Sequence, residues 1–149
     1  ALQNAISAGQ IRLTSDDPHV QPQLDYNYLS HPWDRERMRQ AVRLCVRLAE
    51  NEAFKDLLDE RISPTDQDLA SDEALDEWLL SNVGTQHHSS GTCKMGPELD
   101  PRAVVDQYCQ VYGLEGVKVV DASVMPDVIR ANTNATVFMI AERVADWMQ

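Results

Sequence analysis

The sequence predicts an α+β fold, built from short extended segments and amphipathic helices. Near the amino terminus apolar and polar residues alternate, as they do in a half-buried strand. In the middle and at the end of the chain, apolar residues recur every three or four positions, which is the period of a helix that covers a core. Short valine-rich runs lie between the helical stretches and predict further strands.

Two extended segments are expected first, at residues 11–15 and 24–28, with a loop at Asp16-Asp17-Pro18 between them. A surface helix is expected over residues 33–51. Its apolar face consists of Met38, Val42, Cys45, Leu48 and Ala49.

The next helical stretches are shorter. Residues 53–58 predict a brief helical continuation, and a break follows at Ser63-Pro64-Thr65-Asp66. A further helix is expected over residues 71–81, because Asp72 and Glu73 suit the positive end of a helix dipole.

The last third of the chain predicts a hairpin, a strand and a closing helix. Residues 104–106 and 110–112 indicate the hairpin, and residues 117–121 indicate a strand that ends on Asp121. The closing helix is expected to open at Asn132 or Thr133. Its buried stripe would contain Val137, Ile140, Ala141, Val144 and Met148.

Composition excludes several classes of protein. The 149 residues are 43% hydrophobic and 25% charged, which is enough apolar material for a core and excludes wholesale disorder. The formal net charge is −11, so nucleic acid and anionic membrane headgroups are poor partners. No apolar run approaches the roughly 20 residues that span a bilayer. Three cysteines, an odd number, indicate a reducing compartment, and the cytoplasm is expected.

The first candidate catalytic segment is residues 84–96, which contains three glycines and a pair of histidines. His88 stands among small residues, and histidine suits proton abstraction at neutral pH, but local composition by itself favours a loop histidine that caps backbone carbonyls. A metal site is not expected, because no C-x-x-C or H-x-x-x-H pair is present. Cys93 activated by His88 is a minor alternative.

A second candidate is the strand, loop and helix from residue 117 to residue 135. A helix amino terminus carries unpaired N–H groups and a positive dipole end, so it suits an anionic or electron-accepting ligand. Ordinary helix capping by Asn132 or Thr133 is the open alternative.

Taken together, these segments resemble the carboxyl-terminal part of the glucose-methanol-choline (GMC) flavoprotein oxidoreductases, in particular the choline-dehydrogenase-like branch. The matching residues are His88-x-x-Gly91-Thr92-Cys93-Lys94-Met95-Gly96, Ala103-Val104-Val105-Asp106, Val119-Val120-Asp121-Ala122-Ser123-Val124-Met125-Pro126 and Asn132-x-Asn134-Ala135-Thr136. A looser match in the same order covers the earlier half, through Ile11-Arg12-Leu13, Asp17-Pro18 and Asn27-Tyr28-Leu29.

The resemblance implies an FAD-dependent enzyme that oxidises a small alcohol by moving hydride to the flavin N5. It implies His88 as the base that takes the hydroxyl proton and Asn132 as its hydrogen-bonding partner. The N–H groups of Thr133 and Asn134 would lie near the flavin ring. Two further roles are implied more loosely: Asp121 and Ala122 contact the ribityl and phosphate portion, and Gln86 and His87 line the substrate pocket.

The chain departs from the family at one point, because it has no Gly-x-Gly-x-x-Gly turn for the ADP half of FAD. By resemblance, residues 1–90 form a substrate-binding segment, an antiparallel sheet flanked by helices. Residues 91–149 close the FAD-binding domain with its last strand and helix. We therefore expect a catalytically inactive fragment whose partner is the missing amino-terminal FAD-binding portion.

The electron acceptor, oxygen or a quinone or another carrier, is left open, and an acceptor in a membrane would make the protein membrane-peripheral. The alternative to an enzyme is a free-standing acidic binding domain that keeps the fold without the chemistry.

Overall fold

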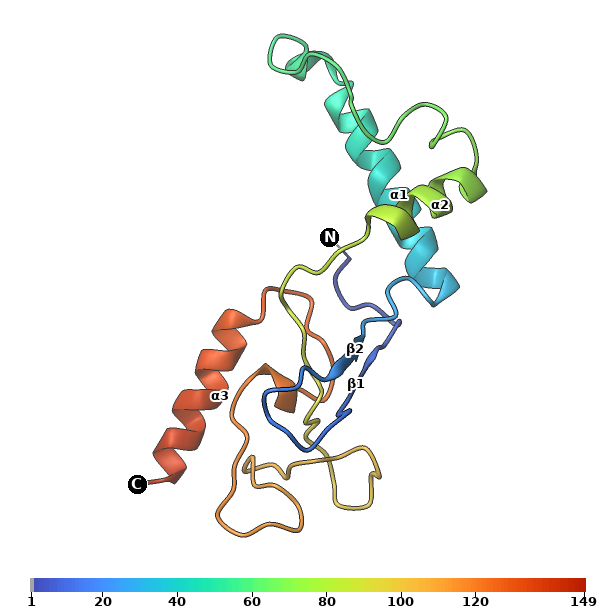
Figure 1. Ribbon diagram of the computed structural model, residues 1–149. Helices are drawn as coiled ribbons and strands as arrows, with labels where there is room; N and C mark the ends of the chain where they lie inside the picture. The colour runs from blue at the N-terminus through green and yellow to red at the C-terminus, as the bar shows by residue number, and fades with distance from the viewer. Residues whose placement is uncertain (1) are drawn as a thin grey trace. The chain divides into compact units, whose positions relative to one another are not determined.

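The computed structural model describes residues 2–149 (Figure 1). The chain forms two compact units, Ala1–Gly84 and Thr85–Gln149, here called the amino-terminal unit and the carboxyl-terminal unit. Within the described residues there are three α-helices and one two-stranded antiparallel sheet, which confirms the α+β class. The predicted domain division after residue 90 stays a prediction.

The sheet pairs β1 (Gln10–Arg12) with β2 (Gln23–Asp25), and Ile11 lies opposite Leu24. Both strands are shorter than expected, and all their residues are exposed. The entry to β1 needs a glycine, because a Cβ at Gly9 would overlap the carbonyl oxygen of Asp25.

Helix α1 (Pro32–Ala49) confirms the helix expected over residues 33–51. Pro32 suits the first turn, where its missing N–H needs no partner. The side chain of His31 caps the helix by accepting a hydrogen bond from the N–H of Trp33 at 3.2 Å.

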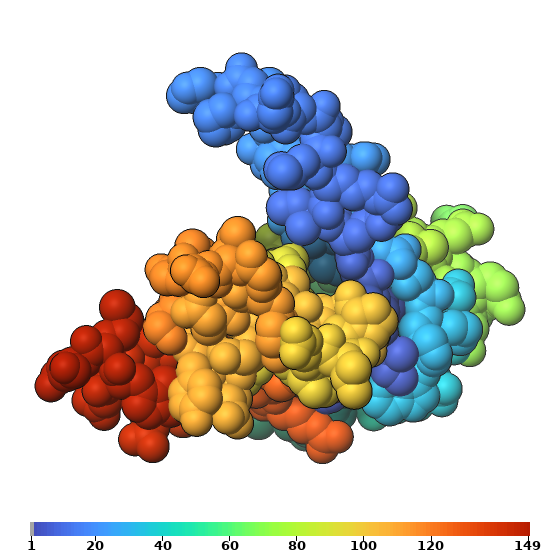
Figure 2. All heavy atoms as spheres, turned by 90° about the horizontal axis from the view of Figure 1, so that it is seen from below, coloured from blue at the N-terminus to red at the C-terminus, as the bar shows by residue number. Residues whose placement is uncertain are grey.

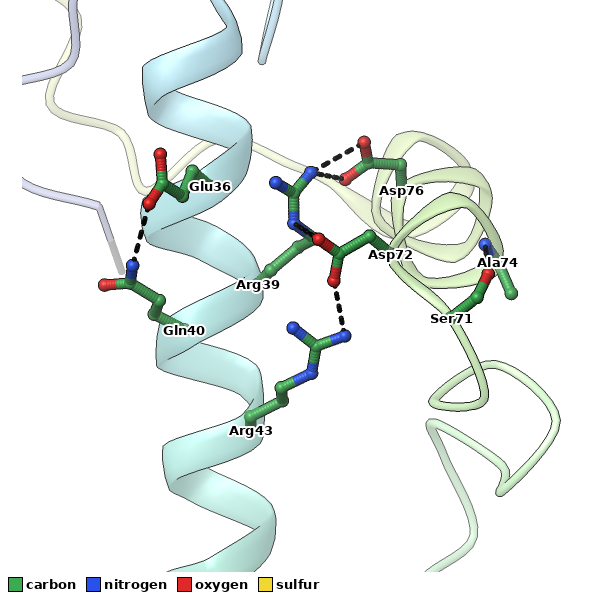
Figure 3. Close-up of polar contacts among 8 residues, drawn as sticks. All are labelled: Glu36, Arg39, Gln40, Arg43, Ser71, Asp72, Ala74 and Asp76. Atoms are coloured by element: carbon green, nitrogen blue, oxygen red, sulfur yellow. Dashed lines mark hydrogen bonds and ion pairs between the residues drawn. The ribbon is translucent and has the colours of Figure 1, made fainter.

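Helix α2 (Asp72–Asn82) begins where the acidic first turn predicts, and Ser71 caps it through a 3.1 Å bond from the N–H of Ala74. The core of this unit consists of Leu29, Leu75 and Leu79, with Met38 and Val42 of α1 packed against it. Figure 3 shows the polar side of the α1–α2 contact, where Arg39 lies between Asp72 and Asp76.

The second half of α1 differs from expectation. Cys45, Leu48 and Ala49 belong to the predicted apolar face, yet all three are exposed. Beyond α1 the helical continuation is a single 3-10 turn, η1 (Glu52–Phe54), capped by Asn51. Between residues 49 and 71 the described chain supplies no long element to cover this face of α1.

The carboxyl-terminal unit is held together mainly by irregular backbone pairing. Its core contains Val105, Cys109, Val124 and Val144, the last contributed by α3 (Asn134–Trp147). The predicted hairpin is present as a single antiparallel bridge between Val105 and Val111. The segment expected as a strand at residues 117–121 likewise pairs through one bridge, Gln110 with Lys118, and continues into the 3-10 turn η2 (Ala122–Val124).

Helix α3 follows the expected stripe only over its first three turns. Val144 is buried and Ile140 is half-buried, whereas Met148 is 69% exposed. Figure 2 shows this end of α3, in red, standing out from the orange and yellow residues of the same unit. None of the helices within residues 2–149 combines the length and the apolar character that a membrane span requires.

Candidate active site

The site is centred on one side-chain pair in the carboxyl-terminal unit. The Nδ1 atom of His88 lies 3.2 Å from Oγ1 of Thr133, although 45 residues separate them in the sequence. Thr133 is buried, with 7% of its surface exposed, and His88 is half-buried. The structure thus brings the first candidate segment to the start of the helix in the second.

Backbone pairing fixes the segment that follows His88. The N–H groups of Gly91, Cys93 and Met95 donate to the carbonyl oxygens of Ala122, Ser123 and Val124 at 3.3, 2.9 and 2.9 Å. The turn into this pairing requires left-handed backbone at Gly91, whose φ is +81°. The two sequence motifs therefore form one joined structure.

The far end of the same segment is held by polar contacts. Lys94 donates to the carboxylate of Asp100 at 2.6 Å, and this bond keeps the pKa of Asp100 below its ordinary value. The hydroxyl of Tyr112 donates to the carbonyl of Gly96 at 2.8 Å. These bonds fix the end of the segment remote from His88.

The start of α3 is open in the way that ligand-binding helix termini are. Thr133 is the N-cap residue, but its backbone is helical and its side chain makes no capping bond. The first intrahelical bond runs from the N–H of Val137 to the carbonyl of Thr133, so the N–H groups before Val137 have no partner in the helix. Asn132 and Asn134, which flank Thr133, are exposed. This terminus presents donors and a positive dipole end.

Asp121 and Ala122 use polar groups in hydrogen bonds to other residues of the same unit. The carboxylate of Asp121 accepts a 2.8 Å bond from the N–H of Ser123 and so caps η2. The carbonyl of Ala122 accepts from both Gly91 and Met125. Any contact of these residues with a ligand falls to groups that this bonding leaves free.

The weaker pocket candidates lie on the approach to His88. Gln86 and His87 are exposed, and His87 has left-handed backbone with φ of 62°. The N–H of His87 donates to the hydroxyl of Thr85 at 2.9 Å. The role of Gln86 and His87 as pocket residues stays a prediction.

The rival chemistries find little geometry to use. Within residues 2–149 no three His, Cys, Asp or Glu side chains are grouped as metal ligands. Cys93 is half-buried in the paired segment. Cys109 is buried in the core, and burial raises the pKa of its thiol, which disfavours the reactive thiolate.

A separate groove of about 1010 Å³ lies within the amino-terminal unit. Its walls are α1 from Met38 onward, the segment that follows α1 as far as Pro64, and Trp78 of α2. None of the predicted site residues lines it, so the groove is not the candidate active site.

The sequence-based prediction missed one contact. Thr133 was expected to act through its backbone N–H, or as an ordinary cap, and not through its hydroxyl. No local pattern could reveal a partner 45 residues away. The only signal is that Thr133 stands between two asparagines at a helix start, where a hydroxyl has either a cap or another partner.

Comparison with known proteins identifies the family to which the chain is related. Residues 5–141 match the GMC oxidoreductase family. The chain is 41% identical over 140 residues to the oxygen-dependent choline dehydrogenase of Photobacterium profundum and 44% identical over 140 residues to that of Cronobacter sakazakii. Each match covers 94% of this chain and 24% of the relative, so the chain spans about a quarter of the length of these proteins.

Solved structures of similar fold are also oxidoreductases. Formate oxidase matches with a TM-score of 0.86 and 31% identity, covering 95% of this chain and 24% of that chain. Pyridoxine 4-oxidase from Mesorbium loti matches with a TM-score of 0.84 and 29% identity, covering 97% and 28%. Since the family match extends over most of the chain, the chain belongs to the GMC oxidoreductase family.

Proposed function

We propose that this chain forms the carboxyl-terminal part of an FAD-dependent enzyme that oxidises an alcohol, with His88 as the base and Asn132 as its hydrogen-bonding partner. The observation that carries the proposal is the contact between His88 and Thr133, which places the imidazole at the open start of α3. Family membership and the choline dehydrogenases among the relatives support an alcohol as the substrate.

In the proposed reaction, His88 accepts the proton of the substrate hydroxyl through Nε2, since Nδ1 is engaged by Thr133. The amide of Asn132 holds the substrate oxygen in place by a hydrogen bond. A bound FAD would supply the acceptor for the hydride that leaves the substrate carbon.

The residues present fit the flavin end of that cofactor. Because the side chain of Thr133 does not cap α3, the N–H groups of Asn134 and its neighbours are available to a ligand. A helix amino terminus stabilises negative charge, which a flavin gains on reduction. Asp121 and Ala122 would contact the ribityl and phosphate portion through the groups that η2 leaves free.

The ADP end of FAD has no counterpart in these 149 residues, which contain no Gly-x-Gly-x-x-Gly sequence. We infer that an amino-terminal FAD-binding portion completes the protein and that this chain alone does not catalyse the reaction. Phe138 and Met139 of α3 are 60% and 62% exposed, which suits burial against such a portion. A reading frame that encodes this glycine sequence upstream would support the inference, and a stoichiometric flavin spectrum from the 149-residue chain would contradict it.

The electron acceptor and the cellular location remain proposals of the same kind. Oxygen is the first acceptor to test, because the curated relatives are called oxygen-dependent, and a quinone is the second. The three cysteines are free within the described structure, which is compatible with the reducing cytoplasm that the sequence suggests.

The deciding experiment uses the full-length protein with bound FAD and choline, the alcohol in the name of the curated relatives. His88→Ala should slow flavin reduction by about 10²-fold or more, the usual effect of a positioned base, while the flavin absorbance stays the same. His19→Ala, which alters an exposed histidine in the amino-terminal unit, is the matched control and should leave the rate unchanged. Equal reduction rates for His88→Ala and wild type would refute the assignment.

A further inference from the structure

The hydroxyl of Thr133 has an unusual hydrogen-bond partner for an N-cap residue. A threonine at this position ordinarily accepts a hydrogen bond from the first turn of its own helix. Here the backbone of Thr133 is already helical, with φ −74° and ψ −18°, and its side chain makes no such bond. Its Oγ1 instead lies 3.2 Å from Nδ1 of His88, in a position that is 7% exposed.

Proton balance decides which of the two groups donates. A neutral imidazole carries one N–H, so one ring nitrogen donates and the other accepts. If Thr133 donated to Nδ1, the hydrogen of His88 would sit on Nε2 and that nitrogen could not take a proton. If Nδ1 donates to Thr133, Nε2 keeps its lone pair. After His88 has accepted a proton both nitrogens donate, and Thr133 serves as an acceptor without any rearrangement.

We propose that Thr133 is a positioning residue that accepts a hydrogen bond from Nδ1–H of His88, and thereby holds the imidazole in the tautomer whose Nε2 takes the substrate proton. This inference rests on the proposed role of His88. It adds a task for a side chain that the family resemblance connects with the flavin only through its backbone.

The fold gives Thr133 the rigidity that such a role needs. Its carbonyl accepts the first bond of α3, from Val137 at 2.9 Å, and α3 is anchored in the core through Val144. Asn132 directly precedes Thr133, so one helix terminus carries both the residue that orients the base and the residue that would hold the substrate oxygen. A group fixed by a helix start is held more precisely than one on a loop.

The test compares Thr133→Val, which keeps the shape but removes the acceptor, with Thr133→Ser, which keeps the hydroxyl. In the full-length protein with FAD, the ring ¹⁵N chemical shifts of His88 report the tautomer directly, and His88→Gln identifies its signals. Wild type and Thr133→Ser should show hydrogen on Nδ1, and Thr133→Val should move it toward Nε2. Flavin reduction by choline should be slowed about tenfold in Thr133→Val, the effect of losing one hydrogen bond, with KM little changed. Thr133→Ser should recover most of that rate.

The outcomes separate this inference from the proposed function. If His88→Ala abolishes rapid reduction but Thr133→Val leaves both tautomer and rate as in wild type, the positioning role is wrong and the base assignment holds. If Thr133→Ser behaves like Thr133→Val, the hydroxyl is not the cause and the inference also fails. If His88→Ala has no effect, the proposed function fails, whereas the tautomer measurement still decides which group donates. Should Thr133→Val not fold, a wild-type spectrum with hydrogen on Nε2 would by itself overturn the inference.

Discussion

The carboxylate of Asp34 accepts hydrogen bonds from both the backbone N–H and the hydroxyl of Ser7, at 2.6 and 2.7 Å. The N–H of Ile6 donates to the same carboxylate at 2.9 Å, and Asp34 is fully buried in the first turn of α1. The hydroxyl of Ser7 in turn accepts from the N–H of His31. A buried carboxylate is thus satisfied by donors, and it ties the segment before β1 to the start of α1.

Removing this carboxylate should destabilise the amino-terminal unit. In Asp34→Ala the N–H groups of Ile6 and Ser7 lose their buried acceptor, and we expect the free energy of unfolding to fall by about 3 kcal/mol. Glu36→Gln, an exposed acid on the same helix, is the control and should change it by less than about 0.5 kcal/mol. Urea unfolding measures both, and hydrogen exchange at Ile6 and Ser7 locates the effect. Unchanged protection of these two amides in Asp34→Ala would contradict the prediction.

The same group predicts a dependence of stability on pH. Burial by itself would raise the pKa of Asp34, but the hydrogen bonds from Ser7 and Ile6 outweigh it and hold the pKa below its ordinary value. The unfolded chain therefore binds a proton at higher pH than the folded chain does. The stabilisation is complete above the pKa of an unfolded aspartate, about 3.9, and is lost as the pH falls from there through the lower native pKa.

The comparison variant for this measurement is Asp34→Asn, which cannot ionise. The difference in unfolding free energy between wild type and Asp34→Asn should be constant at neutral and mildly acidic pH and should shrink below about pH 4. A difference that grows on acidification would show that the native pKa is raised instead.

The contact between α1 and α2 offers a test of partly buried ion pairing. Arg39 donates from one nitrogen to both carboxylate oxygens of Asp76, at 2.9 and 2.8 Å, with 18% and 22% of the two side chains exposed (Figure 3). Arg43 and Asp72 form a 2.7 Å pair that is 37% and 52% exposed. Solvent screens the second pair more strongly.

Double-mutant cycles with alanine should therefore differ between the two pairs. We expect a coupling energy of about 1 kcal/mol for Arg39 with Asp76 and a smaller one, about 0.3 kcal/mol, for Arg43 with Asp72. Because Arg39 also approaches Asp72 at 3.5 Å, the first cycle should be repeated in an Asp72→Ala background. Equal couplings in both cycles would show that burial does not set the strength of these pairs.

Helices were predictable here because their signals are local. The acidic first turn predicted a helix over residues 71–81, and α2 forms at Asp72–Asn82, where Ser71 is the cap and not the first helical residue. The start of α3 was predicted to within two residues, but the cap itself behaves differently, because Thr133 bonds His88 rather than its own helix. Strands were less predictable, since an isolated bridge such as Val105 with Val111 has the same sequence pattern as a full hairpin.

Contacts between distant segments lay beyond the sequence pattern. Nothing in the helical period of α1 separates Asp34 from the exposed acid Glu36, because the donors of Asp34 come from a segment 27 residues earlier. Local patterns singled out His88, Asn132 and Thr133, and the family resemblance implied their roles, but the side-chain bond between His88 and Thr133 came only from the fold. The exposure of Cys45 and Leu48 in α1 also differs from the prediction. Periodicity shows which face of a helix is apolar, but it does not show whether another element covers that face.

Gly91 allows the link between backbone geometry and His88 to be tested. Its φ of +81° is left-handed, so alanine at this position is strained and should lower the free energy of unfolding by about 1 kcal/mol. Relief of that strain would move the N–H of Gly91 away from the carbonyl of Ala122. Because Gly91 lies only three residues after His88, this movement would also displace His88. In the full-length protein with FAD, we expect choline to reduce the flavin of Gly91→Ala at least about tenfold more slowly than that of the wild type. Small displacements of a reacting group lower the rate strongly.

Gly113→Ala is the matched control, because Gly113 has a similar φ of +77° and nothing within 4 Å of an added Cβ. It should lose about the same 1 kcal/mol of stability while the rate of flavin reduction stays at the wild-type value. Stopped-flow absorbance of the flavin gives the rate, and thermal unfolding gives the stability. If both alanine variants slow reduction equally, the rate loss follows from general destabilisation; if only Gly91→Ala does, the turn at Gly91 sets the position of His88.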